Sequence, residues 1–166
     1  PSSRFAQLAA AAQPPSQLLS LMVVFVTAPA SSVAARLGVA DLLKDGSLLV
    51  AVLAHASGTP PRPLYRILRA LASVGIFAED DAGRFKLTPL AEPLRSNIPG
   101  SVRDFSIFVG ADWHWRAWGD LFGSAQSGLP AFERIHDRAY FDYLGENAGA
   151  AEVMNDARTS MSATAR

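Results

Sequence analysis

The sequence predicts a mainly α fold: a winged helix-turn-helix with a small β-hairpin wing, followed by additional long helices. Segment 64–77, LYRILRALASVGIF, carries apolar residues at helical spacing and closes on Gly75, a residue that commonly ends helices. Two short alternating segments then flank the turn sequence DDAG at 80–83, which favours a hairpin. Short helices followed by a hairpin, in this order, predict the winged helix-turn-helix.

Length and composition fit a folded protein with a substantial core. The 166 residues are 49% hydrophobic and carry a formal net charge of +0. A free-standing nucleic-acid binder more often has a basic excess, because neutralising phosphates supplies much of its affinity. Cysteine is absent from the sequence. Its absence excludes disulfides, thiolate zinc sites and a cysteine nucleophile, and it fits a cytoplasmic protein.

The first predicted helix is unusually apolar. Residues 1–15 are expected to be frayed, and a helix is expected from about 16 to 28, where Pro29 ends it. Its apolar positions run nearly all round, so a partner subunit or second domain is expected to cover it. The apolar run 18–30 is shorter than the about 20 residues that a membrane span needs. We therefore predict no membrane contact.

The remaining elements follow in order along the chain. A helix capped by Ser31 or Ser32 stops at Gly38, a short helix within 47–57 ends at Gly58, and a third runs from about 60 to 74. Strands are expected over the following ranges: 76–78 and 84–87. Helices are expected over the following ranges: 101–128 (two, broken near Gly110), 139–147 and 148–166. We divide the chain into a winged-helix domain, 16–98, and a helical extension, 99–166.

The third helix and the wing are the parts of this fold that would contact DNA. Arg62, Arg66 and Arg69 share one face of this helix, the face that would enter a major groove. The wing tip, however, carries Glu79 and Asp80 with a further carboxylate beside them, where phosphates would be repelled. The sequence favours arginines that pair with acids or cover apolar neighbours.

Catalytic motifs are not evident in the sequence. The three histidines lack metal-ligand spacing, and no nucleophile elbow, phosphate loop or glycine-rich dinucleotide loop occurs. Segment 112–118, DWHWRAW, holds three tryptophans. Such a cluster is usually core or interface, and it is also what a pocket for aromatic small molecules uses.

Several segments in order resemble the N-terminal region of S-adenosylmethionine-dependent small-molecule O-methyltransferases, of the plant phenylpropanoid and bacterial polyketide-tailoring type. The resemblance covers roughly residues 16–162. The segments that carry it are AARLGVADLL (34–43), LYRILRALASVGIF (64–77), GRFKLTPLAEPLRS (83–96), PGSVRDF (99–105), WRAWGDL (115–121) and SGLPAF (127–132).

The resemblance implies a dimerisation domain whose long helices interlock in a homodimer and which lines the pocket of a small-molecule acceptor, with no nucleic acid or membrane partner. It implies a catalytic Rossmann-like domain, absent from this chain, that binds S-adenosyl-L-methionine. No catalytic, cofactor-binding or metal-binding residue is assigned within the chain. The pocket residues carried over from the family are Phe108, Trp113, Trp118, Met154, Arg158 and Met161.

The sequence departs from the family pattern in three places. The first helix carries Pro29 where the family tends to continue helical. SLLVAVLA at 47–54 is apolar where the family is polar, and Arg158 stands where a pocket methionine is common. Arg158 either points into the pocket and favours an acidic or strongly polar substrate, or it is a surface change. The alternatives are a stand-alone homodimeric non-catalytic module and a winged-helix DNA-binding regulator.

Overall fold

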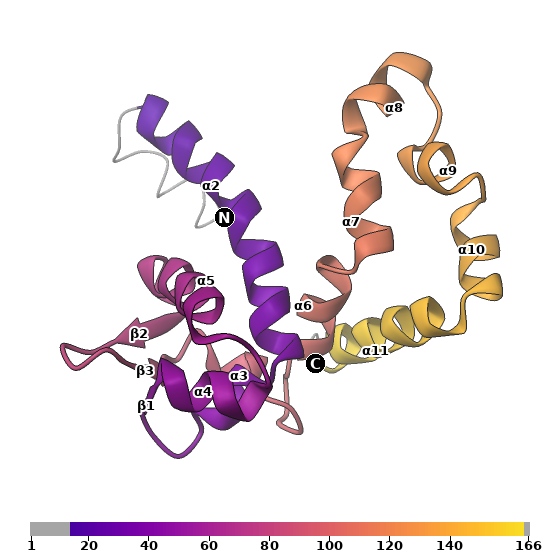
Figure 1. Cartoon of the computed structure of the whole chain (residues 1–166). Helices are drawn as coiled ribbons and strands as arrows, with labels where there is room; N and C mark the ends of the chain where they lie inside the picture. Colours follow the sequence, from indigo (N-terminus) through magenta and orange to yellow (C-terminus); the bar gives the residue numbers. More distant parts are fainter. Residues whose placement is uncertain (1–13, 165–166) are drawn as a thin grey trace.

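The computed structural model describes residues 14–164, and its mainly α fold confirms the prediction (Figure 1). The first elements are α2 (Pro14–Arg36), α3 (Val39–Leu42), β1 (Leu48–Leu49), α4 (Val50–Ser57), α5 (Pro61–Ser73), β2 (Phe77–Glu79) and β3 (Arg84–Leu87). They are followed by η1 (Glu92–Leu94), α6 (Arg103–Val109), α7 (Asp112–Gly119), α8 (Leu121–Ser127), α9 (Ala131–His136), α10 (Tyr140–Glu146) and α11 (Ala148–Thr164). The predicted frayed segment 1–15 lies outside the described residues except for its last two positions, which begin α2.

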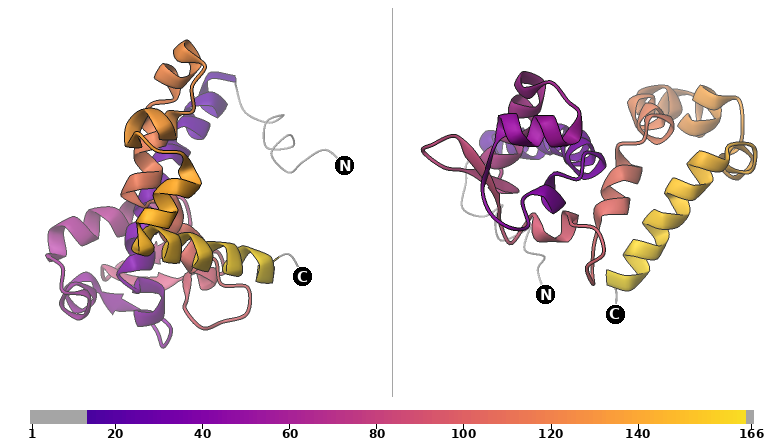
Figure 2. Two further views of the ribbon diagram at one scale, coloured as in Figure 1. Left: turned by 90° about the vertical axis from the view of Figure 1, so that its right-hand side faces the viewer. Right: turned by 60° about the horizontal axis from the view of Figure 1, so that its bottom comes forward.

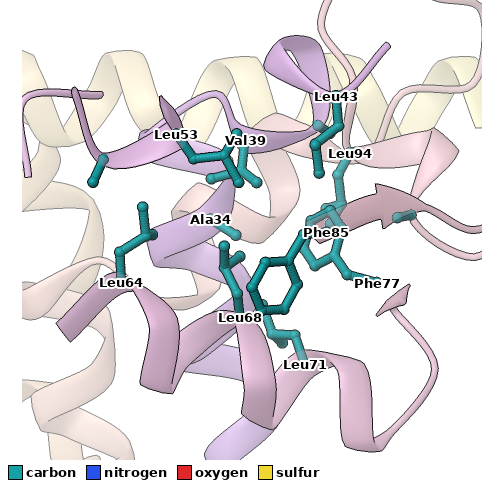
Figure 3. Packing of buried hydrophobic residues seen from close by; sticks show 13 residues of the cluster. Ala34, Val39, Leu43, Leu53, Leu64, Leu68, Leu71, Phe77, Phe85 and Leu94 are labelled. Carbon is teal, nitrogen blue, oxygen red and sulfur yellow. The ribbon is translucent and has the colours of Figure 1, made fainter. Parts of the chain in front are cut away.

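Helix α5 supplies the centre of the core of the winged helix-turn-helix. Leu64, Leu68 and Leu71 recur at helical spacing and are buried on one face of the helix. They pack with Phe77 of β2 and Phe85 of β3, both fully buried (Figure 3). The hairpin therefore closes over the apolar face of α5, as the alternation in the sequence predicts.

The wing is an antiparallel hairpin to which a third, short strand is added. The strand order is β1-β3-β2, and Leu48 of β1 lies opposite Phe85. Asp80 closes the turn. Its Oδ1 accepts hydrogen bonds from the backbone amides of Ala82 and Arg84 at 3.0 Å, and its Oδ2 accepts one from Arg84 Nε at 2.9 Å. These bonds, led by the one from the Arg84 amide, lower the pKa of Asp80.

Helix α2 overturns the prediction that Pro29 ends the first helix. The helix continues through Pro29 to Arg36, so neither Ser31 nor Ser32 caps a new one. Proline removes one backbone donor from a helix interior. Packing holds the turns that follow, because Ser32 is buried and its hydroxyl donates to the carbonyl of Ile107 in α6 at 3.4 Å.

Small residues allow α2 and α6 to approach closely. A Cβ added at Gly110, just after α6, would overlap the side chain of Ser32. At the end of α2, the carbonyl of Ala35 accepts the Gly38 amide at 3.2 Å and also Arg103 Nε of α6 at 3.1 Å. The helix ends at Arg36, just before Gly38, whose positive φ of 65° agrees with the predicted stop, and the Arg103 bond adds a tertiary contact at this end.

Helix α2 is also long and apolar enough over Leu18–Arg36 to cross a membrane, judged by length and composition alone. The prediction that this apolar run is too short to span a membrane is therefore wrong, because it assumed that the helix ends at Pro29. The C-terminal part of the helix is built into the protein core, where Ala34 and Ala35 are buried.

The helical extension forms an arm that leaves the winged-helix body and returns to it. Residues 101–128 form three helices rather than the expected two, with a second break at Asp120, and α9 was not predicted. Asp120 accepts a 2.7 Å bond from Arg134 Nε, which ties this break to α9. Helices α6 to α8 run outward, α9 and α10 turn the chain, and α11 comes back to pack on α6 (Figures 1 and 2).

Candidate functional site

An open hollow lies between α6 and α11, where the arm returns to the body. Its volume is about 350 Å³, at the small end of the range for small-molecule sites. The residues that line it are Phe105 and Phe108 from α6, and Met154, Ala157, Arg158, Met161 and Ser162 from α11. The wall is therefore apolar apart from one guanidinium and one hydroxyl.

Helical spacing brings these side chains to one place. Met154, Arg158 and Met161 stand at i, i+4 and i+7, so they share one face of α11. Phe105 and Phe108 stand at i and i+3 on α6, with ring centroids 6.2 Å apart. Four of the six residues expected from sequence thus meet at this hollow.

Arg158 supplies the positive charge of the hollow. It is exposed, and it forms no ion pair with any carboxylate among residues 14–164. The hydroxyl of Ser162 donates to the Arg158 carbonyl at 2.9 Å, so that hydroxyl already has a partner within α11. The neighbouring acids Glu152 and Asp156 fall on the opposite side of the helix by its 3.6-residue repeat. No carboxylate on the hollow-facing side of α11 competes for the guanidinium.

Trp113 does not line the hollow but supports its wall from behind. Its ring centroid lies 5.7 Å from that of Phe108, 6.3 Å from Phe132, 6.0 Å from Tyr140 and 6.1 Å from Tyr143. Burial in this cluster raises the pKa of Tyr140. The rings connect α7, α9 and α10 to Phe108 and hold its face in position.

Trp118 also lies outside the hollow, on the surface of α7. Its Nε1 donates to Nε2 of His114 at 2.9 Å, which requires that Nε2 to be unprotonated. The His114 ring packs on Phe108 with centroids 4.3 Å apart, and burial lowers the pKa of His114. Trp118 therefore reaches the hollow only through His114 and Phe108.

Phe105, Ala157 and Ser162 line the hollow and were missed by the sequence analysis. Phe105 lies one helical turn before Phe108, and Ser162 lies one turn after Arg158. Extending the helical spacing by one turn in each case would have found both. Ala157 gave no signal, because a small buried residue has no distinctive chemistry.

The N-terminal half of α2 presents a second functional feature, an apolar surface. More than half of each of these side chains is exposed: Leu18, Leu19, Leu21, Met22, Phe25 and Val26. This part of the helix extends away from the winged-helix body (Figure 1). At its lower end, the Phe25 ring packs on Trp115 of α7 with centroids 4.7 Å apart. An apolar surface of this extent marks a binding interface.

Arg62, Arg66 and Arg69 form an exposed arginine face on α5, which a DNA-binding helix would require. Arg69 donates to the Tyr65 hydroxyl at 2.9 Å, and this bond, with a smaller contribution from the charge of Glu79 in the wing, raises the pKa of Arg69. Arg62 and Arg66 form no ion pair within the described part of the chain. The expectation that the arginines pair within the chain therefore has support at Arg69 alone.

The described residues offer neither a metal site nor a nucleotide cradle. No group of three or more His, Cys, Asp or Glu side chains in residues 14–164 is placed to hold a metal ion. The sheet found in that range is the three-stranded antiparallel one of the wing, without a glycine-rich loop leading from a parallel strand into a helix.

Comparisons with known proteins identify the N-terminal unit. A family model described as the O-methyltransferase dimerisation domain matches residues 19–97. The phenazine O-methyltransferase PhzM of Lysobacter antibioticus is 39% identical over 141 residues, which are 85% of this chain and 41% of that protein. The chain thus spans about two fifths of the length of this curated relative.

Solved structures agree with this assignment. The crystal structure of LaPhzM superposes with a TM-score of 0.84 at 37% identity, covering 90% of this chain and 45% of that one. The calicheamicin-biosynthesis methyltransferase CalO1, in its SAH-bound form, superposes with a TM-score of 0.77 at 29% identity, covering 91% and 46%. Residues 19–97 of this chain therefore belong to the O-methyltransferase dimerisation-domain family.

Proposed function

We propose that this chain is the dimerisation and acceptor-binding part of an S-adenosyl-L-methionine-dependent O-methyltransferase that methylates a hydroxyl of a small aromatic metabolite. The observation that carries the proposal is the succession of two features along the chain. A domain of the O-methyltransferase dimerisation family is followed by the helical arm, whose first and last helices, α6 and α11, line an open apolar hollow. The chain would act in the cytoplasm.

Self-association is the role we assign to the α2 apolar surface. Packing this surface against the same helix of a second copy removes its side chains from water, at about 25 cal/mol for each Å² of apolar area buried. A bilayer is the less favourable cover, because the C-terminal half of α2 is held in the core by Ser32, Ala34 and Ala35. Crossing a membrane would pull these residues out of their packing.

Acceptor binding is the role we assign to the hollow. Phe108, Met154 and Met161 offer apolar walls to a flat ring, with Arg158 at the side. Trp113 supports Phe108, and Trp118 acts more remotely through His114. In methyl transfer, such a wall orients the attacking hydroxyl and keeps water away from it.

The cofactor would bind outside the residues described here. S-adenosyl-L-methionine supplies the methyl group in such enzymes, but residues 14–164 do not form a site that fits it. The base that would deprotonate the hydroxyl would likewise lie outside residues 14–164.

A DNA-binding regulator is the competing function, favoured by the exposed arginine face of α5. The wing argues against it, because Asp80 holds the wing closed through its own carboxylate, with Glu79 and Asp81 beside it. Carboxylates at this position would lie close to the phosphates of a bound duplex and weaken the binding.

Sedimentation of the 166-residue chain tests the dimer, since a domain that associates through α2 sediments as a dimer at micromolar concentration. Leu21→Glu places a charge in the α2 apolar surface, where burial in an interface would disfavour it, so this variant should sediment as a monomer. Leu90→Glu is the matched control, because Leu90 and Leu21 are 60% and 58% exposed. A wild-type chain that remains monomeric would refute the proposal.

A further inference from the structure

The geometry points to a planar aromatic carboxylate as the class of molecule that the hollow binds, with its carboxylate paired to Arg158. This inference rests on the proposed function, because it specifies what occupies the proposed acceptor pocket. It goes further by assigning the charge of that molecule and the residue that recognises it.

The guanidinium in the hollow is isolated from other charged groups of the described residues. Arg158 is the one charged group among the side chains that line the hollow, and no carboxylate of residues 14–164 forms an ion pair with it. The other arginines near α6 differ in this respect. Arg95 is paired with Glu92 at 3.0 Å, and Arg103 with Asp104 at 3.4 Å.

The Arg158 side chain lies on the side of α11 that faces the hollow. Arg158 shares its face of α11 with Met154 and Met161, which line the same hollow. Surface arginines on this helix would gain more from the face that carries Glu152 and Asp156, where i, i+4 partners are within reach. The guanidinium is instead placed beside apolar side chains and lacks a counter-ion of its own.

The wall of the hollow suits a flat aromatic ring. Phe105 and Phe108 lie on one side of the hollow, and the thioethers of Met154 and Met161 on the other. Aromatic rings and thioethers both make favourable contacts with an aromatic ligand. A guanidinium at the edge of such a slot presents two parallel N–H donors, which match the two oxygens of a carboxylate lying in the plane of the ring.

Calorimetric titration of the chain with 2-naphthoate and with its neutral isostere 2-naphthamide tests the inference. The acid should bind about tenfold more tightly than the amide, as a partly screened charge-assisted pair allows. Arg158→Gln should abolish that preference by lowering the affinity for the acid. Its affinity for the amide should stay within about twofold of the wild-type value. Raising the salt concentration should lower the affinity for the acid and leave the affinity for the amide unchanged.

Two further variants isolate the guanidinium. Arg158→Lys keeps the charge and loses the planar fork, so it should retain only part of the preference for the acid. Arg66→Gln on α5 is the matched control, since Arg66 is also exposed and also lacks an ion pair in the described residues. That variant should bind both ligands as the wild type does.

The outcomes separate this inference from the proposed function. If acid and amide bind equally to the wild-type chain, or if Arg158→Gln leaves the preference intact, the inference is overturned and the acceptor pocket stands. If neither ligand binds the wild-type chain, the acceptor pocket itself is refuted, and the inference falls with it.

Discussion

At the scale of single residues, His114 shows how neighbours determine protonation. The hydrogen bond from Trp118 occupies Nε2, and the Phe108 ring shields the imidazole from water. Both effects favour the neutral form, and burial lowers the pKa of His114. The histidine therefore acts as a flat aromatic spacer between Trp118 and the wall of the hollow.

The stability of the chain should therefore depend on pH through His114. Its pKa is lower in the folded chain than the ordinary 6.5. Its contribution is therefore fully present above about pH 6.5 and is lost as the pH falls through the folded value. Thermal unfolding between about pH 7.5 and about pH 5 should show a smaller loss of stability in His114→Gln than in the wild type. His55→Gln, at an exposed position on α4, serves as the control. Equal pH slopes in all three proteins would contradict the assignment.

At the scale of elements, the crossing of α2 over α6 positions the base of the arm. Ser32 and Gly110 approach so closely that a single added methyl group has no room. The Ser32 hydroxyl and the Arg103 guanidinium then bond to carbonyls of the facing element. The place where the arm leaves the body is thus set by backbone contacts as much as by apolar burial.

Gly110→Ala should destabilise the fold by about 1–3 kcal/mol, the usual cost of overpacking a close contact. Gly119→Ala at the end of α7 is the matched control. A Cβ there meets nothing within 4 Å, so alanine should be neutral or stabilise by about 0.5 kcal/mol. Chemical denaturation of both variants measures the difference. The double variant Ser32→Gly with Gly110→Ala should recover part of the loss. Equal stability of Gly110→Ala and the wild type would show that the helix crossing can accommodate a methyl group and would contradict this prediction.

Sequence patterns predicted the elements whose signals are local. The buried leucines of α5, the glycine after it and the carboxylate-closed wing all obey short-range rules. Pro29 did not end α2, because buried small residues beyond it hold the helix together. Strand β1 escaped notice, because Leu48 and Leu49 form a strand only by pairing with residues 84 and 85 of β3, far away in sequence.

The part of the hollow that one helix contributes was predictable, because side chains three and four residues apart lie on the same face of a helix. Met154, Arg158 and Met161 were carried over from the family resemblance, and their helical spacing explains why they meet on one face of α11. Trp113 and Trp118 were carried over from the same resemblance, but the structure puts one behind the wall and the other on the surface. Which ring of an aromatic cluster faces a cavity depends on how helices cross, and no local pattern encodes that angle.

At the scale of the whole molecule, the buried core is unevenly distributed. The core cluster extends from Ala34 to Leu94 and lies within the winged-helix body (Figure 3). In the described part of the arm, from residue 103 to residue 164, Phe132 is the one large apolar side chain that is buried. The arm is held mainly by ring contacts and by ion pairs such as Asp120–Arg134.

This distribution predicts two levels of local stability, because opening a segment costs in proportion to the apolar contacts that are broken. Backbone amides of α5 and β3 should exchange with deuterium only when the whole chain unfolds. Amides of α7 to α10 should exchange sooner, through partial opening of the arm. Mass-spectrometric exchange of the intact chain measures both, and uniform protection from α2 to α11 would rule this out. The hollow between α6 and α11 would then open and close with the arm while the winged-helix body stays folded.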